Sequence, residues 1–489
     1  MNRTLGSTFI AIMMLAAAIP ATADDMKLTY DDLRSSMSAN NTALLSAGEE
    51  YTSALIDVED AKSNYHPQVG YTVAGSYVLN HQTMDLSGVQ YTLGDIAPGV
   101  KKLEGLADMQ IPLPGIDLKD LKGLSNTPVG IPDPVSIDVS DPYLSASISL
   151  VQPIYTWGKI TSNVKMNEEI AQAKALQIGD TQAQLDAQLK ALLASLYYLK
   201  DFDDILQEMK SDADELVDIA RSGSEAGVAL SQDVAQAQVG AKQLELAIVQ
   251  VRTQVDTLVS QLETLTGIRG LTPEMIDYVP DEDFYDRIAN ADRRILELQA
   301  TGNGQATMQM LDHMVSATQY AQKAADRSMY VVPDIALSVS ADYSAPMTRD
   351  FVEHSAWGVT VAVALQGTIW DGGQRLNDRD RAESATRSAQ IARQQAVDTI
   401  HTTLAQNFAS IDLALARIDY QDADIAMLED QLAVEETKLE YGTGSRQDVI
   451  QKRIELNQAK LDRLTSRITL ATSCHTVEYL TGFTAQNTR

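Results

Sequence analysis

The sequence predicts an α+β membrane protein in which short strands span a membrane and very long helices continue beyond it. Three observations lead to this prediction: short segments that alternate apolar with small or polar residues, helical segments of unusual length, and an internal duplication of both. Alternation with a period of two is typical of strands, whereas a 3-4 spacing of apolar residues is typical of helices packed lengthwise as coiled coils.

The N-terminus has the pattern of a secretory signal peptide. An apolar run from Phe9 to Ile19 follows Arg3 and precedes Ala21-Thr22-Ala23, a typical cleavage site. We therefore expect residues 1–23 to be removed on export. No later run reaches the roughly 18 apolar residues of a membrane-spanning helix, so any membrane crossing is expected to use strands in a β-barrel.

Composition excludes several classes of function. The net charge of −29 argues against binding nucleic acid, whose phosphates need Lys and Arg. Cys474 is the single cysteine, so no disulfide within one chain is possible, and it lies far from any N-terminal lipid-anchor position. The sequence has no catalytic or phosphate-binding motif, and its six histidines are scattered. We expect no enzyme activity, no cofactor and no metal site.

The first half of the mature chain, residues 24–267, is expected to form a helix, a β-hairpin and a long helical hairpin. The pattern predicts a helix over 25–64, strands at the two ends of a hairpin over 68–155, and helices over 159–266 with a break near 223–227. Residues 80–142 hold seven of the 14 prolines and show no sustained period, so they are expected to form a long extracellular loop. Residues 268–300 are expected to be a polar equatorial connector.

The second half, residues 301–482, repeats this order. Gly158 matches Gly373, Gly227 matches Gly442, and Leu265-Thr266-Gly267 matches Leu480-Thr481-Gly482, each at a separation of 215 residues. A second β-hairpin is therefore expected over 334–370 and a second helical hairpin over 374–481, followed by a tail at 483–489.

Four strands in one chain imply an oligomer. Four strands cannot close a barrel, an open strand edge is not tolerated in lipid, and outer-membrane barrels begin at eight strands. Three copies would give twelve. One predicted girdle of aromatic residues at the loop end of the strands contains Tyr77, Tyr143, Tyr343 and Trp357. A soluble sheet edged with aromatics is the alternative.

Several short motifs and their order resemble the TolC-like outer-membrane efflux proteins. They are Gln152-Pro153-Ile154-Tyr155, Trp370-Asp371-Gly372-Gly373, and Gly442 followed by Asp448-Val449. The resemblance implies a homotrimer in the Gram-negative outer membrane, with a twelve-stranded β-barrel that continues into a periplasmic α-helical barrel. It also implies a periplasmic adaptor (membrane fusion) protein and an inner-membrane transporter as partners, in tripartite efflux or type I secretion. The protein would be a passive exit duct for small molecules or polypeptides.

The resemblance also assigns site residues. The predicted periplasmic gate contains Asp448, Gln451 and Asp233, where a ring of Asp448 would gather cations. In family members with a charged constriction an aspartate stands where this chain has Gln451. Acidic residues in the first turn of a helix also favour the helix dipole, so a purely local role stays open.

The predicted adaptor-contacting tips are Gly227, Val228, Ala229, Leu230 and Ser231, and Gly442, Thr443, Gly444, Ser445 and Arg446. The same glycines are also what an ordinary turn between helices needs. The predicted strand-to-helix turns contain Trp157 and Gly158, and Trp370, Asp371, Gly372 and Gly373.

Two further expectations concern charge and class. A run of acidic residues between Asp201 and Asp218 has Lys210 as its only nearby cation. A solvated outer helix face is the favoured interpretation, and a lining of the lower lumen that would favour cations is the alternative. The alternative function is a periplasmic coiled-coil scaffold or adaptor protein that does not enter the membrane. Adaptors carry one helical hairpin, whereas this chain duplicates hairpin and strands together.

Overall fold

The computed structural model describes residues 27–76, 91–92, 128–129, 143–329, 332–346 and 356–483. It divides into two compact units. The helical unit comprises residues 1–63, 158–330 and 370–489, and the strand unit comprises residues 64–157 and 331–369. The predicted loop at 80–142 lies almost entirely outside the described residues, apart from a pair formed by β3 (Tyr91–Thr92) and β4 (Pro128–Val129).

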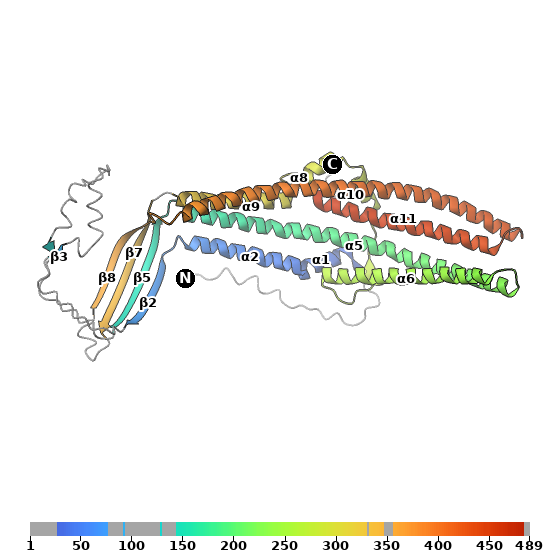
Figure 1. Ribbon diagram of the computed structural model, residues 1–489, viewed down its shortest axis with the longest axis horizontal. Coiled ribbons are helices and arrows are strands. Elements are labelled where there is room, and N and C mark those ends of the chain that lie inside the picture. The colour runs from blue at the N-terminus through green and yellow to red at the C-terminus, as the bar shows by residue number, and fades with distance from the viewer. Residues whose placement is uncertain are drawn as a thin grey trace. The chain divides into compact units, whose positions relative to one another are not determined.

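The strand unit contains a four-stranded antiparallel sheet in the order β2-β5-β7-β8 (Figure 1). Its strands are β2 (Gln68–Ser76), β5 (Tyr143–Tyr155), β7 (Asp334–Pro346) and β8 (Ala356–Gln366). All four were expected from their alternating pattern. The register places apolar residues opposite one another on one face, as in the pairs Tyr71–Ile148 and Val339–Val361. The other face pairs small or polar residues, as in Ser340–Thr360.

The helical unit is built on two helices of equal length and two shorter helices of equal length. α5 (Lys159–Glu225) and α10 (Gln374–Glu440) each have 67 residues, while α6 (Ser231–Thr266) and α11 (Arg446–Thr481) each have 36. At 1.5 Å per residue the longer pair extends roughly 100 Å. The remaining long helices are α2 (Thr42–Ser63) and α9 (Ala306–Ser328). None of the described helices is both long and apolar enough to cross a membrane.

The helices pack side by side in rows (Figure 1). Where α5 and α10 begin, the contacts give the order α2-α5-α9-α10; where they end, the order is α6-α5-α11-α10. The core consists of several clusters along these contacts rather than one centre, and one of them joins Leu206 and Met209 of α5 to Val251 of α6 and Leu461 of α11. The predicted helical hairpins therefore form, and they pack on each other within one chain.

Two element predictions need correction. The helix expected over 25–64 is interrupted: β1 (Leu28–Thr29) precedes α1 (Tyr30–Asn40), and Asn41 separates α1 from α2. The Asn41 side-chain amide donates to the Leu265 carbonyl oxygen at 3.0 Å, while its Oδ1 accepts from the Ala43 amide at 2.9 Å. A buried side chain thus ends one helix and caps the next, which explains the break.

The connector at 268–300 is not a merely polar linker. It contains a 3₁₀ turn (Pro273–Met275), β6 (Ile276–Asp277), which pairs with β1, and the helices α7 (Glu282–Asn290) and α8 (Arg293–Thr301). The largest core cluster contains α7 and α8 side chains: Phe284, Tyr285, Ile288, Leu296 and Ala300.

A buried polar chain anchors this connector on α11. The Tyr285 hydroxyl lies 3.3 Å from His475 Nε2, and His475 Nδ1 lies 2.9 Å from a Glu478 oxygen. Lys190 Nζ of α5 donates to the other Glu478 oxygen at 2.6 Å. Burial would raise the pKa of Glu478, but the bonds from His475 and Lys190 outweigh it and hold that pKa below its ordinary value.

Candidate functional site

The two helical hairpins turn by the same local geometry. The first turn joins α5 to α6 and the second joins α10 to α11, and Gly227 and Gly442 both have a φ of 73°. This left-handed conformation favours glycine because a Cβ would be strained there. Val228 and Leu230 are among the most exposed apolar side chains of the first turn, as is Tyr441 beside the second. The structure thus places the predicted tip residues in or beside two exposed turns.

The predicted gate residues lie just beyond these turns, and the two aspartates among them each have a local bond. Ser445 Oγ accepts from the Asp448 amide at 3.1 Å and donates to the Asp448 carboxylate at 2.6 Å. In the first hairpin the Leu230 amide donates to the Asp233 carboxylate at 2.9 Å. Both aspartates therefore stabilise the first turn of a helix, and both remain exposed together with Gln451. Asp448 and Asp233 therefore favour the helix dipole and also present an exposed negative charge.

An ion pair connects the two hairpins near their tips. Arg446 Nε and Nη2 donate to the two carboxylate oxygens of Glu215, at 2.6 and 2.7 Å. This bidentate bond lowers the pKa of Glu215. Since Arg446 begins α11 and Glu215 belongs to α5, the contact joins the second hairpin to the first.

A second pair lies deeper in the same contact. Arg453 Nη1 binds Asp212 Oδ1 at 2.9 Å, and the side chain of Asp212 is 7% exposed. Asp212 Oδ2 is buried without a hydrogen-bond partner. Burial raises the pKa of Asp212, and Arg453 offsets only part of that effect. The ionised form of Asp212 therefore depends on its ion pair with Arg453.

These pairs correct the prediction that Lys210 is the only cation near the acidic run. Lys210 binds Asp214 within α5, but Arg252 of α6 also binds Asp203 at 3.2 Å, and α11 supplies Arg446 and Arg453. The acidic run is therefore partly a helix-helix contact surface. Sequence patterns could not show this, because these arginines lie 49 to 241 residues from their partners.

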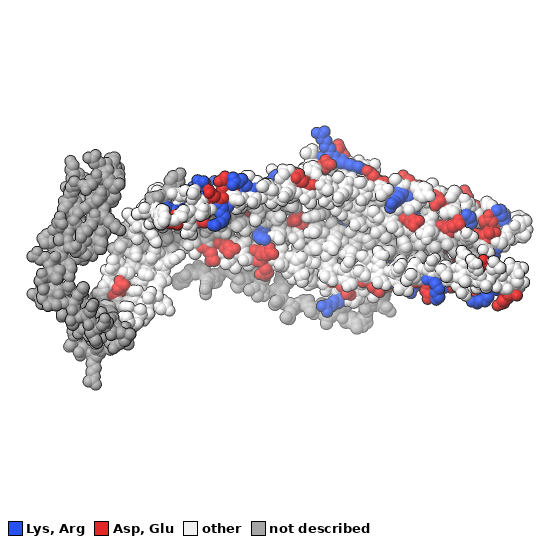
Figure 2. All heavy atoms as spheres, viewed as in Figure 1, with Lys and Arg blue, Asp and Glu red and all other residues white. Residues whose placement is uncertain are grey.

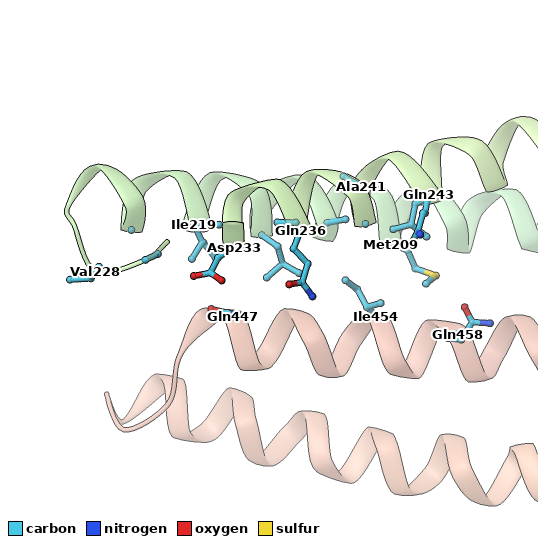
Figure 3. A pocket seen from close by; sticks show the side chains of 18 residues that line it. Met209, Ile219, Val228, Asp233, Gln236, Ala241, Gln243, Gln447, Ile454 and Gln458 are labelled. Carbon is cyan, nitrogen blue, oxygen red and sulfur yellow. The ribbon is translucent and has the colours of Figure 1, made fainter. Parts of the chain in front are cut away.

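A groove of about 880 Å³ lies between the first hairpin and α11 (Figure 3). Its lining combines apolar side chains with glutamines, and Asp233 is its only charged lining residue. Figure 3 shows Asp233 and Gln236 pointing across the groove toward Gln447 and Ile454 of α11. The groove reaches the first tip through Val228. An apolar and amide lining of this kind suits an apolar ligand or the apolar face of a helix better than a small anion or metal ion.

The strand-to-helix turns also share one geometry. Trp157 and Gly158 have φ values of 56° and 76°, and Gly372 and Gly373 have values of 71° and 93°. Trp157 is the only non-glycine residue with positive φ in the described chain. Its indole Nε1 donates to the Pro333 carbonyl oxygen at 3.1 Å, which holds the side chain in place. The sequence reasoning missed this strained position, although Trp157 aligns with Gly372 at the repeat distance of 215 residues, a signal that could have marked it.

Asp371 organises the second of these turns. Its carboxylate accepts from the Gly373 amide at 3.1 Å and from Arg375 Nε at 2.8 Å. Both contacts fix the first turn of α10, so the predicted turn residue has a capping role. Trp370, beside it, is highly exposed.

The sequence matches one protein family over both halves of the duplication. Residues 112–268 and 299–482 match the family described as outer membrane efflux protein. The chain belongs to this family. It is an outer-membrane efflux protein, with its helical part in the periplasm. The family match sets aside the alternative of an adaptor or scaffold that does not enter the membrane.

Solved structures of similar fold agree with this assignment. The CmeC outer membrane channel of Campylobacter jejuni is 13% identical, with a TM-score of 0.66 over 93% of this efflux protein and 85% of that chain. VceC of Vibrio cholerae, an outer membrane protein, is 13% identical, with a TM-score of 0.64 over 92% and 96%. At this identity the likeness concerns the fold. No curated protein matches the sequence.

The structure describes only some of the four residues of the predicted aromatic girdle. Trp357 of β8 is highly exposed, and it lies opposite Tyr343 of β7, which is half-buried. Tyr143 begins β5 and pairs in register with Ser76 and Pro346. Tyr77 lies outside the described residues. In the described chain no group of three or more His, Cys, Asp or Glu side chains could hold a metal ion.

Proposed function

We propose that the protein is a passive homotrimeric exit duct whose twelve strands, four from each copy, close a barrel in the outer membrane. The observation that carries this proposal is the sheet of the strand unit. Its apolar face is exposed along both edge strands, with Tyr71 at 82% and Val361 at 67%. Figure 2 shows few charged side chains on the visible strand face and many on the helical unit. An exposed apolar face opposite a small polar face is the pattern of a lipid-facing strand.

The open ends of the sheet and of the helix rows support a ring of copies. β2 and β8 end the sheet, α2 and α10 end one helix row, and α6 and α10 end the other. One end of a copy would therefore meet the opposite end of the next, a head-to-tail contact that forms a ring. Two copies would give eight strands, whose interior is filled by side chains, whereas twelve leave room for a duct.

The helical part would extend this duct through the periplasm toward an adaptor and an inner-membrane transporter. The exposed tips around Gly227 and Gly442, with the groove between the hairpins, are the proposed adaptor contacts. Asp448, together with Gln451 and Asp233, is the proposed gate. Because Asp448 lies exposed just past the second tip, three copies around an axis would form an acidic ring that attracts cations.

The two faces of β8 give a matched test of the barrel. Val361→Lys places a charge on the apolar face, where a mid-membrane lysine costs about 2 to 4 kcal/mol. Thr360→Lys places the same charge one residue away on the polar face. We expect Val361→Lys to lower the amount of folded, heat-modifiable protein in outer membranes, and Thr360→Lys to leave it near the native level. Equal loss in both variants would contradict the assignment of the faces.

The gate proposal has its own measurement. Asp448→Asn should reduce the cation preference of the reconstituted channel, read as the reversal potential across a salt gradient in planar bilayers. Asp233→Asn is the matched variant in the first hairpin. An unchanged reversal potential in Asp448→Asn would leave this carboxylate with only its helix-capping role.

A further inference from the structure

Three exposed cations lie together where the end of α9 packs beside the start of α5. Lys165 of α5 and Lys323 of α9 both place their ammonium groups over the ring of Tyr320, at 5.5 and 4.5 Å from its centroid. Arg327, one turn beyond Lys323, donates to two neutral oxygens of α5 and its N-cap, at 2.8 and 2.9 Å. All three cationic side chains are exposed. Lys165, Lys323 and Arg327 are called the basic cluster below.

The basic cluster has no carboxylate partner in the part of the chain that the structure describes. The chain has 67 Asp and Glu against 38 Lys and Arg, so acidic side chains are abundant elsewhere. The nearest ones along α5, Glu168 and Glu169, contact Lys62 at 3.9 Å and His313 at 2.6 Å instead. Along α9 the exposed Asp326 adjoins the cluster but forms no ion pair with it. The positive charge of the cluster therefore remains largely uncompensated.

The basic cluster belongs to the end of the helical unit from which the strands continue in sequence. β5 ends at Tyr155, ten residues before Lys165, and β7 begins at Asp334, seven residues after Arg327. At 1.5 Å per residue, Lys165 is about 9 Å along α5 from its first residue, Lys159. The polar headgroup layer on each side of a bilayer is roughly 5 to 8 Å thick, and a long lysine stem lets its ammonium group reach into that layer. With the strands across the hydrocarbon core, as proposed above, the cluster lies near the phosphates of the periplasmic leaflet.

The basic cluster also lies on the side of the helix row that carries the connector. Lys165, Asp186 and Lys200 share one position of a seven-residue repeat along α5, and such positions face one way in helices packed as coiled coils. Asp186 binds Arg34 of α1 at 3.0 Å, and Lys200 borders a pocket that connector residues 273–279 also line. A duct cannot run through the connector, so the opposite side of the row would face the lumen. The cluster therefore faces outward, toward lipid.

We propose that the basic cluster binds the phosphate group of an anionic phospholipid in the periplasmic leaflet. This inference rests on the proposed barrel and adds a lipid site outside the strands. The ammonium groups of Lys165 and Lys323 lie about 10 Å apart at most and repel each other, so a phosphodiester between them is favoured. Tyr320, whose ring both groups contact, is of a residue type enriched at headgroup depth. A zwitterionic lipid fits less well, because the cations would repel its ammonium group.

Lipid titrations of the full-length protein test the site. Native mass spectrometry in a non-ionic detergent measures the affinity for phosphatidylglycerol, which is anionic, and for phosphatidylcholine, which is zwitterionic. One cation near an anionic lipid surface contributes about fivefold in affinity. Lys165→Gln/Lys323→Gln should therefore bind phosphatidylglycerol about 25-fold more weakly, with a much smaller change for phosphatidylcholine. An unchanged affinity for phosphatidylglycerol would overturn the proposal.

Two control variants separate the site from net charge and from folding. Lys200 is exposed, forms no ion pair in the described chain and shares the position of Lys165 in the repeat, but lies about 50 Å further along α5. Lys200→Gln should leave the affinity for phosphatidylglycerol unchanged, and a loss equal to that of the double variant would refute a local site. Lys165→Arg/Lys323→Arg keeps both charges and should keep the affinity. An equal loss in this arginine variant would mean that charge is not the cause, which also overturns the proposal.

Asp326→Asn tests the same site in the opposite direction. It removes the carboxylate that adjoins the cluster and should strengthen phosphatidylglycerol binding by up to about fivefold; weaker binding would contradict the proposal. Millimolar inorganic phosphate should not displace the lipid from the native protein, and displacement would identify a site for the free anion instead. If the protein conducts in planar bilayers but lipid binding does not depend on the cluster, the lipid site is wrong and the duct stands. If the protein neither inserts nor conducts, the proposed function fails as well.

Discussion

Replacement of Arg453 by methionine tests how the two hairpins hold each other near their tips. The substitution keeps an unbranched side chain but removes the cation bound to Asp212 at 2.9 Å. Removing one partner of a fully buried ion pair costs about 3 to 5 kcal/mol. Because the side chain of Arg453 is 32% exposed, we expect a smaller loss, about 1 to 3 kcal/mol.

The loss should depend on pH in a defined direction. Burial raises the pKa of Asp212 above its ordinary value of 3.8, so the ionised carboxylate costs folded-state stability and the cost appears as pH rises through the raised pKa. Without Arg453 the pKa should rise further. The deficit of Arg453→Met should therefore be largest near pH 7.5 and shrink toward pH 4.

Hydrogen exchange of the peptides at the start of α11 measures this local stability. A loss of 1 to 3 kcal/mol corresponds to about 5- to 150-fold faster exchange. Asp212→Asn in the same chain should recover most of the loss, since it removes the unpaired charge. Arg446→Met, which breaks the exposed pair with Glu215, is the matched control and should change exchange much less. A deficit that is equal at both pH values, or that Asp212→Asn does not rescue, would refute the reasoning.

Two further predictions concern turns and the connector. Gly442→Ala should lower the free energy of unfolding by about 1 kcal/mol, the cost of a left-handed conformation alone, because a Cβ there meets nothing within 4 Å. Gly267→Ala should lower it by more, because its Cβ would also lie 2.7 Å from the Asn40 Cβ. Thermal melting of the two variants, followed by circular dichroism, should rank them in that order. Glu478→Gln should lower the melting temperature at pH 7 but much less below the ordinary pKa of 4.5, since a carboxylate with a lowered pKa stabilises the fold only while it is ionised. An equal loss at pH 7 and pH 3 would mean that the charge bound by Lys190 is not responsible.

Regular periodicity explains which elements the sequence could predict. The four strands and the long helices each repeat one pattern over many residues, and the duplication showed that both halves follow the same order. The break at Asn41 could not be predicted, because the residue that explains it, Leu265, lies 224 positions away. The connector helices could have been found: Phe284, Tyr285 and Ile288 have the spacing of one helix face, but the acidic residues around them hid it.

The candidate site was predictable in position but not in its bonds. Glycines at the repeat distance marked both tips and both strand-to-helix turns. The bonds of Asp448 to Ser445 and of Asp233 to the Leu230 amide follow from ordinary capping patterns three residues apart. By contrast, Arg446 and Glu215 are 231 residues apart in the sequence, and only the packing of α11 on α5 brings them into contact. Long-range ion pairs of this kind carry no local signature.

Because α5 and α10 have equal lengths, as do α6 and α11, the two helical hairpins of the chain are matched in length. An insertion in one hairpin alone would leave its tip protruding and would displace every facing residue along the neighbouring helix. Matched insertions of seven residues in all four helices would keep each facing pair and lengthen the reach by about 10 Å. Evolution can therefore adjust the span to a deeper or shallower compartment only in paired steps, one heptad at a time.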